Sequence, residues 1–420
     1  MIHSWSRYLH TFFCLVIIHS YAIGQFDPIK VCVTNVNGEC IPNSLLTVMP
    51  FLRIIPDARS GAMGDVGLAT TADANSMHFN ASKLVFTERN FSISASYTPW
   101  LRELDRKGVY LAYLSGYKRL SDGHAIGLSL KTFSLGDTNF IDLNGNIAGM
   151  GKPREMEIAG AYALKIKNNF SIGITAKYIS SDLGIPQQVH SPDFESPKSF
   201  AAGFSMTYQT EIGTNDNELR LATSISNLGP KLSYTNSTVT DFLPGNLGIG
   251  TSYKHNFNSN HSLTLAVDVN KLLVPTPQPF RIIENPGESN ERETDNPNFD
   301  RNGPDNFGPD GFADYRQQSL FSGVFSSFTD APGGFSEELQ ELTYSGGLEY
   351  LFKNTLAIRT GYFYEHALKG NRKYLTAGIG INYKRLSLDF SYLKPRSNSR
   401  SLLNNTLRLS LIFNGSMFQS

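Results

Sequence analysis

The chain contains histidine, serine and aspartate, the side chains from which hydrolytic sites are built. After the first 24 residues the histidines are His78, His124, His190, His255, His261 and His366. No serine lies in a G-x-S-x-G nucleophile motif, and His255 and His261 fall at a short predicted turn. A lone histidine at a strand end is usually a surface or interfacial residue. We therefore predict that the protein is not an enzyme and uses no cofactor.

Two cysteines could form a crosslink. Cys32 and Cys40 follow the first 24 residues, and in an oxidising compartment they would form one disulfide. If Asn37-Gly38 makes a two-residue hairpin turn, Cys32 lies too far along the strand to reach Cys40, so the disulfide requires a wider loop. A metal site would need two further ligands nearby, and the neighbouring sequence has none.

The most distinctive motif lies in residues 25–89, which lack the alternation of strands. It reads PDARSGAMGDVGLATTADANSMHFNASKL from Pro56 to Leu84. Its glycines suit close backbone packing, and its Asp and Asn residues suit the caps of short helical turns. A phosphate-binding loop would need Gly-Lys-Ser/Thr after a strand, which is missing. The residues given this structural role are Pro56, Asp57, Arg59, Gly61, Gly64, Asp65, Gly67, Asp73, Asn75 and Asn80.

Composition and the N-terminus restrict the class of protein. The 420 residues include 37 basic and 37 acidic side chains, so no basic face for nucleic acid is expected. Residues 1–24 combine Arg7, the apolar run from Thr11 to Ile18 and Ala22-Ile23-Gly24, which predicts a cleaved signal peptide. Beyond residue 24 no stretch approaches the ~18 apolar residues of a spanning helix. The protein is therefore expected to be exported, as a soluble protein or a barrel.

From residue 90 to about residue 415, apolar and polar residues alternate in fourteen runs of the length that crosses a membrane as a strand. Short connections such as Lys353-Asn354 and Lys384-Arg385 alternate with long ones, as periplasmic turns alternate with external loops. Tyrosines fall at both strand ends, where interfacial girdles form. Those named for the girdles are Tyr97, Tyr117, Tyr178, Tyr208, Tyr253, Tyr350, Tyr364, Tyr383 and Tyr392. We predict an all-β, antiparallel outer-membrane barrel of about 14 strands, with residues 25–89 as a periplasmic or hatch segment that plugs it.

The connection 275–338 is too long for a hairpin loop and too polar to form a core, so we predict a solvated external loop. Its acidic stretch 295–310 lacks the D-x-[DN]-x-[DN]-G spacing of a calcium loop, and calcium stays the minor alternative. Residues 318–328 could touch a partner or fold back on the barrel mouth. The candidate contact residues are Leu320, Phe321, Val324, Phe325 and Phe328.

The stretch from Pro56 to Lys83 resembles the N-terminal signature of the PorV family of the type IX secretion system, itself related to the FadL family of hydrophobic-substrate channels. The resemblance extends from Thr47 to the C-terminus and includes the strand count. Two positions depart from it: Ala62, where the family more often has Gly, and Ala81-Ser82, where it often has Pro-Ala. These departures leave room for a paralogue with a different client.

The resemblance implies a non-enzymatic protein of the outer membrane. PorV-like proteins are described as receiving cargo with type IX C-terminal domains from the translocon (SprA) and passing it to an attachment complex with a PorU-like sortase. The contacts would lie on the barrel rim and the external loops, with outer-membrane lipid around the wall. The loops are 136–155, 182–199, 227–246 and 275–338. The alternative is a FadL-like channel for fatty acids or other hydrophobic solutes, which would need an apolar lumen.

Overall fold

A computed structural model describes most of the chain, with gaps at the N-terminus and in several connections. The described residues are 43–100, 108–141, 147–185, 195–213, 216–235, 240–279, 281–282, 292–293, 312–313, 315–396 and 406–418. The predicted signal peptide, Cys32, Cys40 and the acidic stretch 295–310 lie outside these residues.

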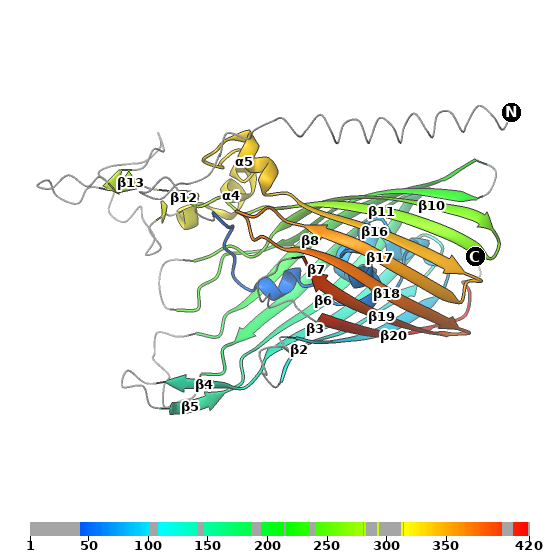
Figure 1. Cartoon of the computed structure of the whole chain (residues 1–420), viewed down its shortest axis with the longest axis horizontal. Helices are drawn as coiled ribbons and strands as arrows, with labels where there is room; N and C mark the ends of the chain where they lie inside the picture. The colour runs from blue at the N-terminus through cyan, green and yellow to red at the C-terminus, as the bar shows by residue number, and fades with distance from the viewer. Residues whose placement is uncertain are drawn as a thin grey trace, which may run out of the picture.

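Fourteen antiparallel strands close into one barrel (Figure 1). They are β1 (Phe91–Pro99), β2 (Val109–Arg119), β3 (His124–Leu135), β6 (Arg154–Lys167), β7 (Phe170–Asp182), β8 (Lys198–Ile212), β9 (Asn217–Leu228), β10 (Asn246–Asn258), β11 (His261–Leu272), β16 (Thr343–Phe352), β17 (Leu356–Tyr364), β18 (Lys373–Tyr383), β19 (Leu386–Pro395) and β20 (Thr406–Asn414). Each pairs with the next, and β1 pairs with β20 with Ile93 opposite Phe413. The predicted all-β barrel and its strand count are confirmed.

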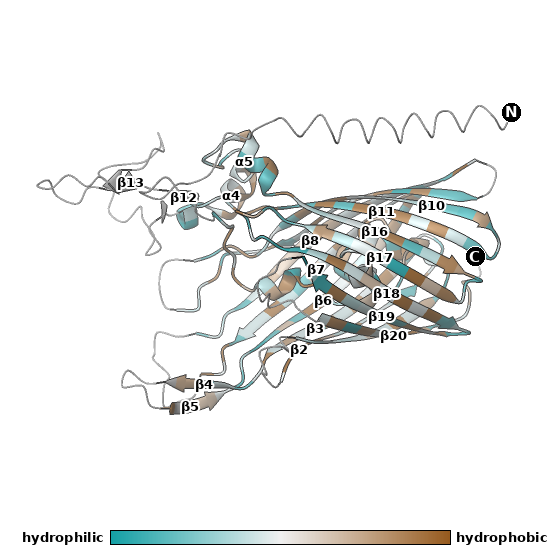
Figure 2. Ribbon diagram, in the orientation of Figure 1, coloured by the Kyte–Doolittle hydropathy of each residue, from teal (hydrophilic) through white to brown (hydrophobic). Residues whose placement is uncertain are grey.

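Hydrophobic and hydrophilic residues alternate along the barrel strands (Figure 2). In β1, Ile93 and Tyr97 point outward and are about half exposed, while Ser94 and Ser96 point inward and are buried. This period of two follows from the pleat, which sends successive side chains to opposite faces. No helix among the described residues is long and apolar enough to cross a membrane.

The two ends of the barrel differ in their connections. At one end the strands are joined by tight turns, in which Lys353, Asn354 and Lys384 adopt positive φ angles of 52°, 51° and 55°. At the other end the connections are long, as predicted, and some carry structure of their own. These elements are β4 (Thr138–Ile141), β5 (Ile147–Gly151), β12 (Gln278–Pro279), β13 (Arg281–Ile282), β14 (Arg292–Glu293), β15 (Phe312–Ala313), η5 (Tyr315–Gln317), α4 (Leu320–Ser326) and α5 (Phe335–Gln340). The long-loop end is the external end, as in other outer-membrane barrels.

The prediction of an interfacial girdle position is wrong for one tyrosine, Tyr117. Tyr117 is 6% exposed and points into the lumen, where its side chain packs against Leu84 and Val85. Ala125 of β3 and Ala159 of β6 belong to the same buried cluster. The inward residues of β2 are partly apolar because the lumen is filled with protein, so apolar residues do not mark only the lipid side.

Residues 43–89 fill the lumen as a plug (Figure 1). Its elements are η2 (Pro50–Arg53), α2 (Ala58–Ala62), α3 (Ser76–Phe79) and η3 (Ala81–Phe86). At the external end the Asn43 backbone N–H donates to Leu368 and that of Val48 to Phe242. At the other end the Asn90 backbone N–H donates to Ser416. The chain therefore crosses the lumen once, from the external mouth to the periplasmic end, before the first strand begins.

The connection 275–338 is only partly a solvated loop. Phe242, Val274 and Tyr315 form a buried cluster on the external rim, and Leu320 of α4 packs against it. The part of this connection nearest to β16 thus folds back on the barrel mouth, one of the two alternatives for residues 318–328.

Candidate functional site

The signature motif begins with a capped helix in the lumen. Asp57 is the N-cap of α2, and its carboxylate accepts a hydrogen bond of 2.8 Å from the Ser60 backbone N–H, as the sequence predicted. The Asp57 side chain is fully buried, and this burial, with the nearby Asp73 carboxylate, raises the pKa of Asp57 to about 6. The next backbone N–H, of Ala58, donates to the Ser410 hydroxyl of β20.

Arg59 connects the plug to the barrel wall by a charge network. Its guanidinium makes two hydrogen bonds to the Glu349 carboxylate of β16, at 3.0 and 2.9 Å, and one of 3.0 Å to Asp73. Glu349 also accepts from Arg359 of β17 at 2.7 Å, and Arg359 donates to Asp389 of β19 at 2.6 Å. Two arginines and three carboxylates therefore join the plug to three wall strands, and the Arg59–Glu349 pair has the bidentate geometry that is strongest for such pairs.

At Gly64 the backbone of the plug lies directly against the backbone of the wall. Its φ is +70°, and a Cβ there would lie 2.6 Å from the backbone N and O of Tyr362. Only glycine combines that backbone conformation with such contact. Asp65 follows with a φ of 68°; it accepts from the Tyr374 hydroxyl and lies 3.6 Å from the Arg408 guanidinium. Asp65 therefore contacts the wall and is not the predicted helix cap.

The second half of the motif is hydrogen-bonded to two other wall strands, β11 and β8. The Gly67 and Leu68 backbone N–H groups donate to the Asp268 carboxylate of β11 at 2.7 and 2.9 Å. Asn80 caps η3 by accepting from the Ser82 N–H at 3.0 Å, and its amide donates to Thr207 of β8 at 2.8 Å. These bonds satisfy polar groups that would otherwise be buried without partners.

Of the predicted caps at Asp73 and Asn75, the structure contains only the first. The Asp73 carboxylate accepts from the backbone N–H groups of Asn75 and Ser76, at 2.9 and 3.1 Å, and so starts α3. Asn75 stands at the N-cap position without a capping bond from its side chain. Its amide oxygen instead accepts from Ser115 of β2 at 3.2 Å. The predicted cap is wrong for Asn75, because its amide oxygen accepts the hydrogen bond from the Ser115 hydroxyl of the wall and not from the helix backbone.

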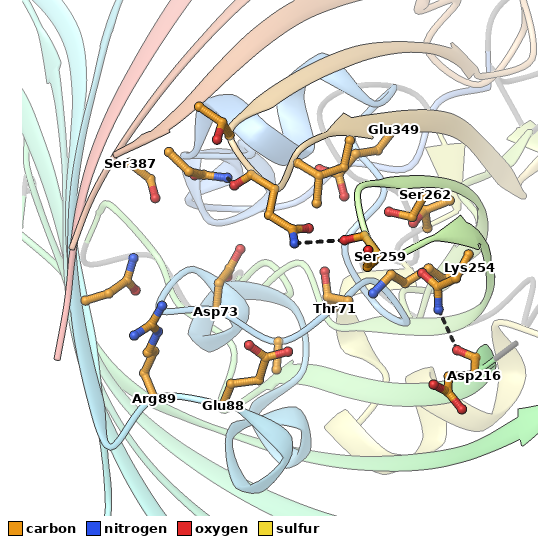
Figure 3. A pocket seen from close by; sticks show the side chains of 18 of the residues that line it. Thr71, Asp73, Glu88, Arg89, Asp216, Lys254, Ser259, Ser262, Glu349 and Ser387 are labelled. Carbon is orange, nitrogen blue, oxygen red and sulfur yellow. Dashed lines mark hydrogen bonds between the residues drawn. The ribbon is translucent and has the colours of Figure 1, made fainter. Parts of the chain in front are cut away.

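The lumen has a polar vestibule at its periplasmic end. This cavity of about 1000 Å³ is bordered by the plug and by the ends of several strands. Figure 3 shows Asp73, Glu88, Arg89 and Lys254 among its lining side chains. A second, smaller space of about 110 Å³ lies deeper, between the plug and the wall. Charged side chains of both signs border the vestibule, which suits water rather than an apolar solute.

The external half of the lumen is closed by an apolar cluster. Met49, Phe51 and Leu52 of the plug are buried against Leu111 and Ile179 of the wall. Their packing leaves the plug tight at this end. Elsewhere the inward side chains of the wall are mainly hydroxyl-bearing or charged. Buried examples are Ser94, Ser129, Lys131, Glu157, Thr207, Ser252, Asp268, Glu349 and Ser410.

A second charge cluster holds α5 on the external rim. Lys271 of β11 lies 2.8 Å from both the Glu338 and Glu341 carboxylates. Lys369 lies 2.5 Å from Glu337 and 3.0 Å from Glu341. The Asn43 amide also donates to Glu337 at 3.1 Å, so this cluster joins the helix, the wall and the outer end of the plug.

The candidate contact residues of α4 divide between two faces. Leu320 packs on the rim cluster and Val324 is half-buried. Phe321, Phe325 and Phe328 are 70%, 74% and 42% exposed. Phe335 and Leu339 of α5 add exposures of 76% and 46%. The external rim therefore presents large apolar side chains outward, which in soluble parts of proteins marks interaction surfaces.

Sequence reasoning did not find the wall partners of the plug. Glu349, Arg359, Asp268 and Arg408 stand inside strands, where a charged side chain must face the lumen of a barrel. That rule marks them as inward residues but does not identify their partners. Among the described residues, no group of three or more His, Cys, Asp or Glu side chains lies together as metal ligands would.

Comparisons with known proteins agree with the barrel fold and with the signature motif. The family "Type IX secretion system protein PorV" matches residues 39–279. The comparison with curated proteins found no match. Among solved structures, the CymD monoaromatic hydrocarbon channel is 12% identical with a TM-score of 0.49, covering 87% of this chain and 98% of its own.

Two further solved structures are similar in the same range. The Ralstonia pickettii toluene transporter TbuX has a TM-score of 0.46 at 12% identity, covering 86% of this chain and 98% of its own. A Pseudomonas aeruginosa FadL homologue has 0.43 at 12%, covering 89% and 100%. The family match spans more than half of this chain and includes the whole signature motif, and the closed barrel indicates the outer membrane. The chain belongs to the PorV family of type IX secretion system proteins.

Proposed function

We propose that this protein receives secreted cargo with type IX C-terminal domains from a SprA-type translocon and passes it to the surface attachment complex. It acts by binding alone, without catalysis or a cofactor. The observation that carries the proposal is the family match over residues 39–279, joined to a barrel whose lumen is plugged. The contacts with cargo lie on the external rim.

The lumen supports this choice over a channel for hydrophobic solutes. A solute entering from outside would have to displace Met49, Phe51 and Leu52 from a fully packed cluster. Deeper in the lumen it would meet a wall of hydroxyl and charged groups such as Lys131 and Glu157. Transfer of an apolar molecule along such a surface gains little from burial.

The external rim supports a binding role. Phe321 and Phe325 lie on one side of α4 and are among the most exposed aromatic side chains of the described chain. Aromatic side chains of this kind are enriched at protein interfaces and provide most of their binding energy. The helix itself is held by Leu320 on the rim cluster, so the aromatics stand on a fixed base.

The test is affinity purification of the tagged protein from outer membranes, with mass spectrometry of what accompanies it. We expect the large translocon barrel and proteins with type IX C-terminal domains. A variant with Phe321→Ser and Phe325→Ser should retain about tenfold less cargo, since losing two aromatic anchors commonly costs more than 1.4 kcal/mol. The matched control is Phe321→Leu with Phe325→Leu, which keeps the surface apolar.

Three readings separate the outcomes. Loss of cargo in the serine variant alone supports the proposal and the rim as its site. Equal amounts of cargo with the serine and the leucine variants would show that the aromatic side chains of α4 are not part of the binding site. Recovery of the barrel without translocon or cargo, and with fatty acids bound, would overturn the proposal in favour of the channel.

A further inference from the structure

An apolar groove lies on the outside of the barrel wall, beneath α5. It is lined by Leu247, Ile249, Val269, Phe328, Phe335, Leu339 and Leu342, together with Asn270, Lys271 and Glu338. Its volume is about 210 Å³. A dry apolar cavity of roughly 150 Å³ is enough to bind a benzene ring. The groove can therefore hold a stretch of a linear hydrocarbon chain.

The wall side of the groove is part of the lipid-facing surface. Ile249 of β10 is 60% exposed, and Leu265 and Val267, further along the outward row of β11, are 50% and 39% exposed. Leu247 and Val269 continue these two outward rows toward the external end. The groove is thus continuous with the surface that meets lipid acyl chains, at the level of the outer leaflet.

The helix side of the groove is fixed in place. Its charged lining residues, Lys271 and Glu338, pair with each other at 2.8 Å, and Lys271 also pairs with Glu341. Their charges are used in this pairing and do not face an incoming ligand as free ions. Phe335 and Leu339 line the groove and remain 76% and 46% exposed. A helix pinned by buried ion pairs and carrying an exposed apolar face suits insertion at a membrane surface.

From this geometry we propose that the groove between α5 and the β10–β11 wall binds an acyl chain of an outer-leaflet membrane lipid. The chain lies along Ile249 and Val269 and is covered by Leu339 and Phe335. The external rim is thereby anchored to the membrane on this side, close to the cluster of Lys271 and Glu338. The proposal does not depend on the cargo function.

The first test uses tryptophan fluorescence in vesicles of phosphatidylcholine brominated on its acyl chains. Trp5 and Trp100 are the tryptophans of the sequence, so a background with both Trp5→Phe and Trp100→Phe isolates a new reporter. We expect bromolipid to quench Phe335→Trp nearly as strongly as Ile249→Trp, the lipid-facing reference. Trp100 in the Trp5→Phe protein, which packs against Phe133 with ring centroids 6.0 Å apart, is the control that bromolipid quenches least. Quenching of Phe335→Trp no stronger than that of Trp100 would overturn the proposal.

The second test measures occupancy. Protein extracted from phosphatidylcholine vesicles in mild detergent is weighed intact by native mass spectrometry. We expect a retained lipid, and about tenfold lower retention in Leu339→Ser, since removing buried methylene contacts of this size is worth more than 1.4 kcal/mol. Phe321→Ser, on α4 and outside the groove lining, should retain the lipid.

Each outcome of the second test bears on the groove. Equal retention in Leu339→Ser and in the unaltered protein would overturn the proposal. So would retention of added oleic acid without any phospholipid, because the occupant would then be a free solute. Heat-modifiable migration in gels, which reports a folded barrel, verifies that each variant is folded.

Discussion

At the scale of single residues, the plug is held by side chains that lie far apart in the sequence. Arg59 and Glu349 are separated by 290 positions, and Ala58 and Ser410 by 352. Each such bond holds the plug against strands near the C-terminus, which are synthesised last. These residues therefore stabilise the attachment of the plug to the wall. Their loss should lower the stability of the whole barrel.

Arg59→Gln should destabilise the folded barrel. Removing one member of a buried ion pair costs roughly 3–5 kcal/mol, and Arg359 remains beside Glu349, so we expect about 3 kcal/mol. The measurement is the temperature at which the barrel loses its folded migration in detergent. Arg154→Gln, at an exposed position, is the control and should change nothing.

A double-mutant cycle sharpens this test. If Arg59 and Glu349 act as a pair, the loss in the variant with both Arg59→Gln and Glu349→Gln should be smaller than the sum of the single losses. Additive losses would show that the two residues contribute independently. The plug would then owe its attachment to other bonds.

Asp57 gives the plug a predictable pH dependence. The folded state holds the carboxyl proton with a pKa of about 6, against ~3.9 for an unfolded aspartate. A raised pKa means that this group contributes stability below pH ~4 that is lost as the pH rises through about 6. Asp57→Asn keeps an oxygen for the Ser60 cap but has no proton to lose.

The comparison is between melting temperatures of the two proteins from pH 4 to pH 8. The difference between Asp57→Asn and the unaltered protein should grow in favour of the variant as the pH rises toward 6, and then stay constant. Curves that run parallel over this range would contradict a raised pKa at Asp57.

At the scale of elements, the sequence predicts strands well and the plug only in outline. The pleat and the lipid force a period of two, so β1 and the other thirteen strands can be located from alternation alone. The path of the plug depends on partners such as Glu349 and Asp268, which no local pattern identifies. Tyr117 shows the same limit, since its inward orientation depends on the plug that it touches.

The short helices of the external rim also could not be predicted from the sequence. The stretch around α5 is polar, and its glutamates suggest a solvated loop. They are buried instead, because Lys271 and Lys369 neutralise Glu337, Glu338 and Glu341. Buried charges survive only when paired in this way.

Lys369→Met should release α5 from the rim. Glu337 and Glu341 would lose a buried cation and would draw water into the cluster. We expect faster hydrogen exchange at residues 335–341 and faster cleavage there by an added protease, with the barrel still folded. Lys152→Met, at a lysine whose side chain is 70% exposed, is the control. Unchanged exchange in Lys369→Met would show that the Lys271 ion pairs and apolar packing hold the helix without Lys369.

At the scale of the whole molecule, the proposed function makes the plugged barrel and its structured external rim a platform that binds cargo and not a channel. Deletion of the gene should leave type IX cargo folded but trapped in the periplasm. The measurement is the amount of cargo with an intact C-terminal domain in periplasmic and surface fractions. An outer-membrane protein that uses another route is the control, and normal surface cargo in the deletion strain would contradict the proposed role.

The single passage of the plug through the lumen also constrains how the barrel is assembled. α2 contacts β17, β18, β19 and β20, and β20 is the strand that closes the cylinder against β1. A cylinder closed while empty would need the plug threaded through it afterwards, against a wall that Gly64 touches at backbone distance. Closure around the preceding segment avoids this, so the last strands complete the seam and enclose the plug in the same step.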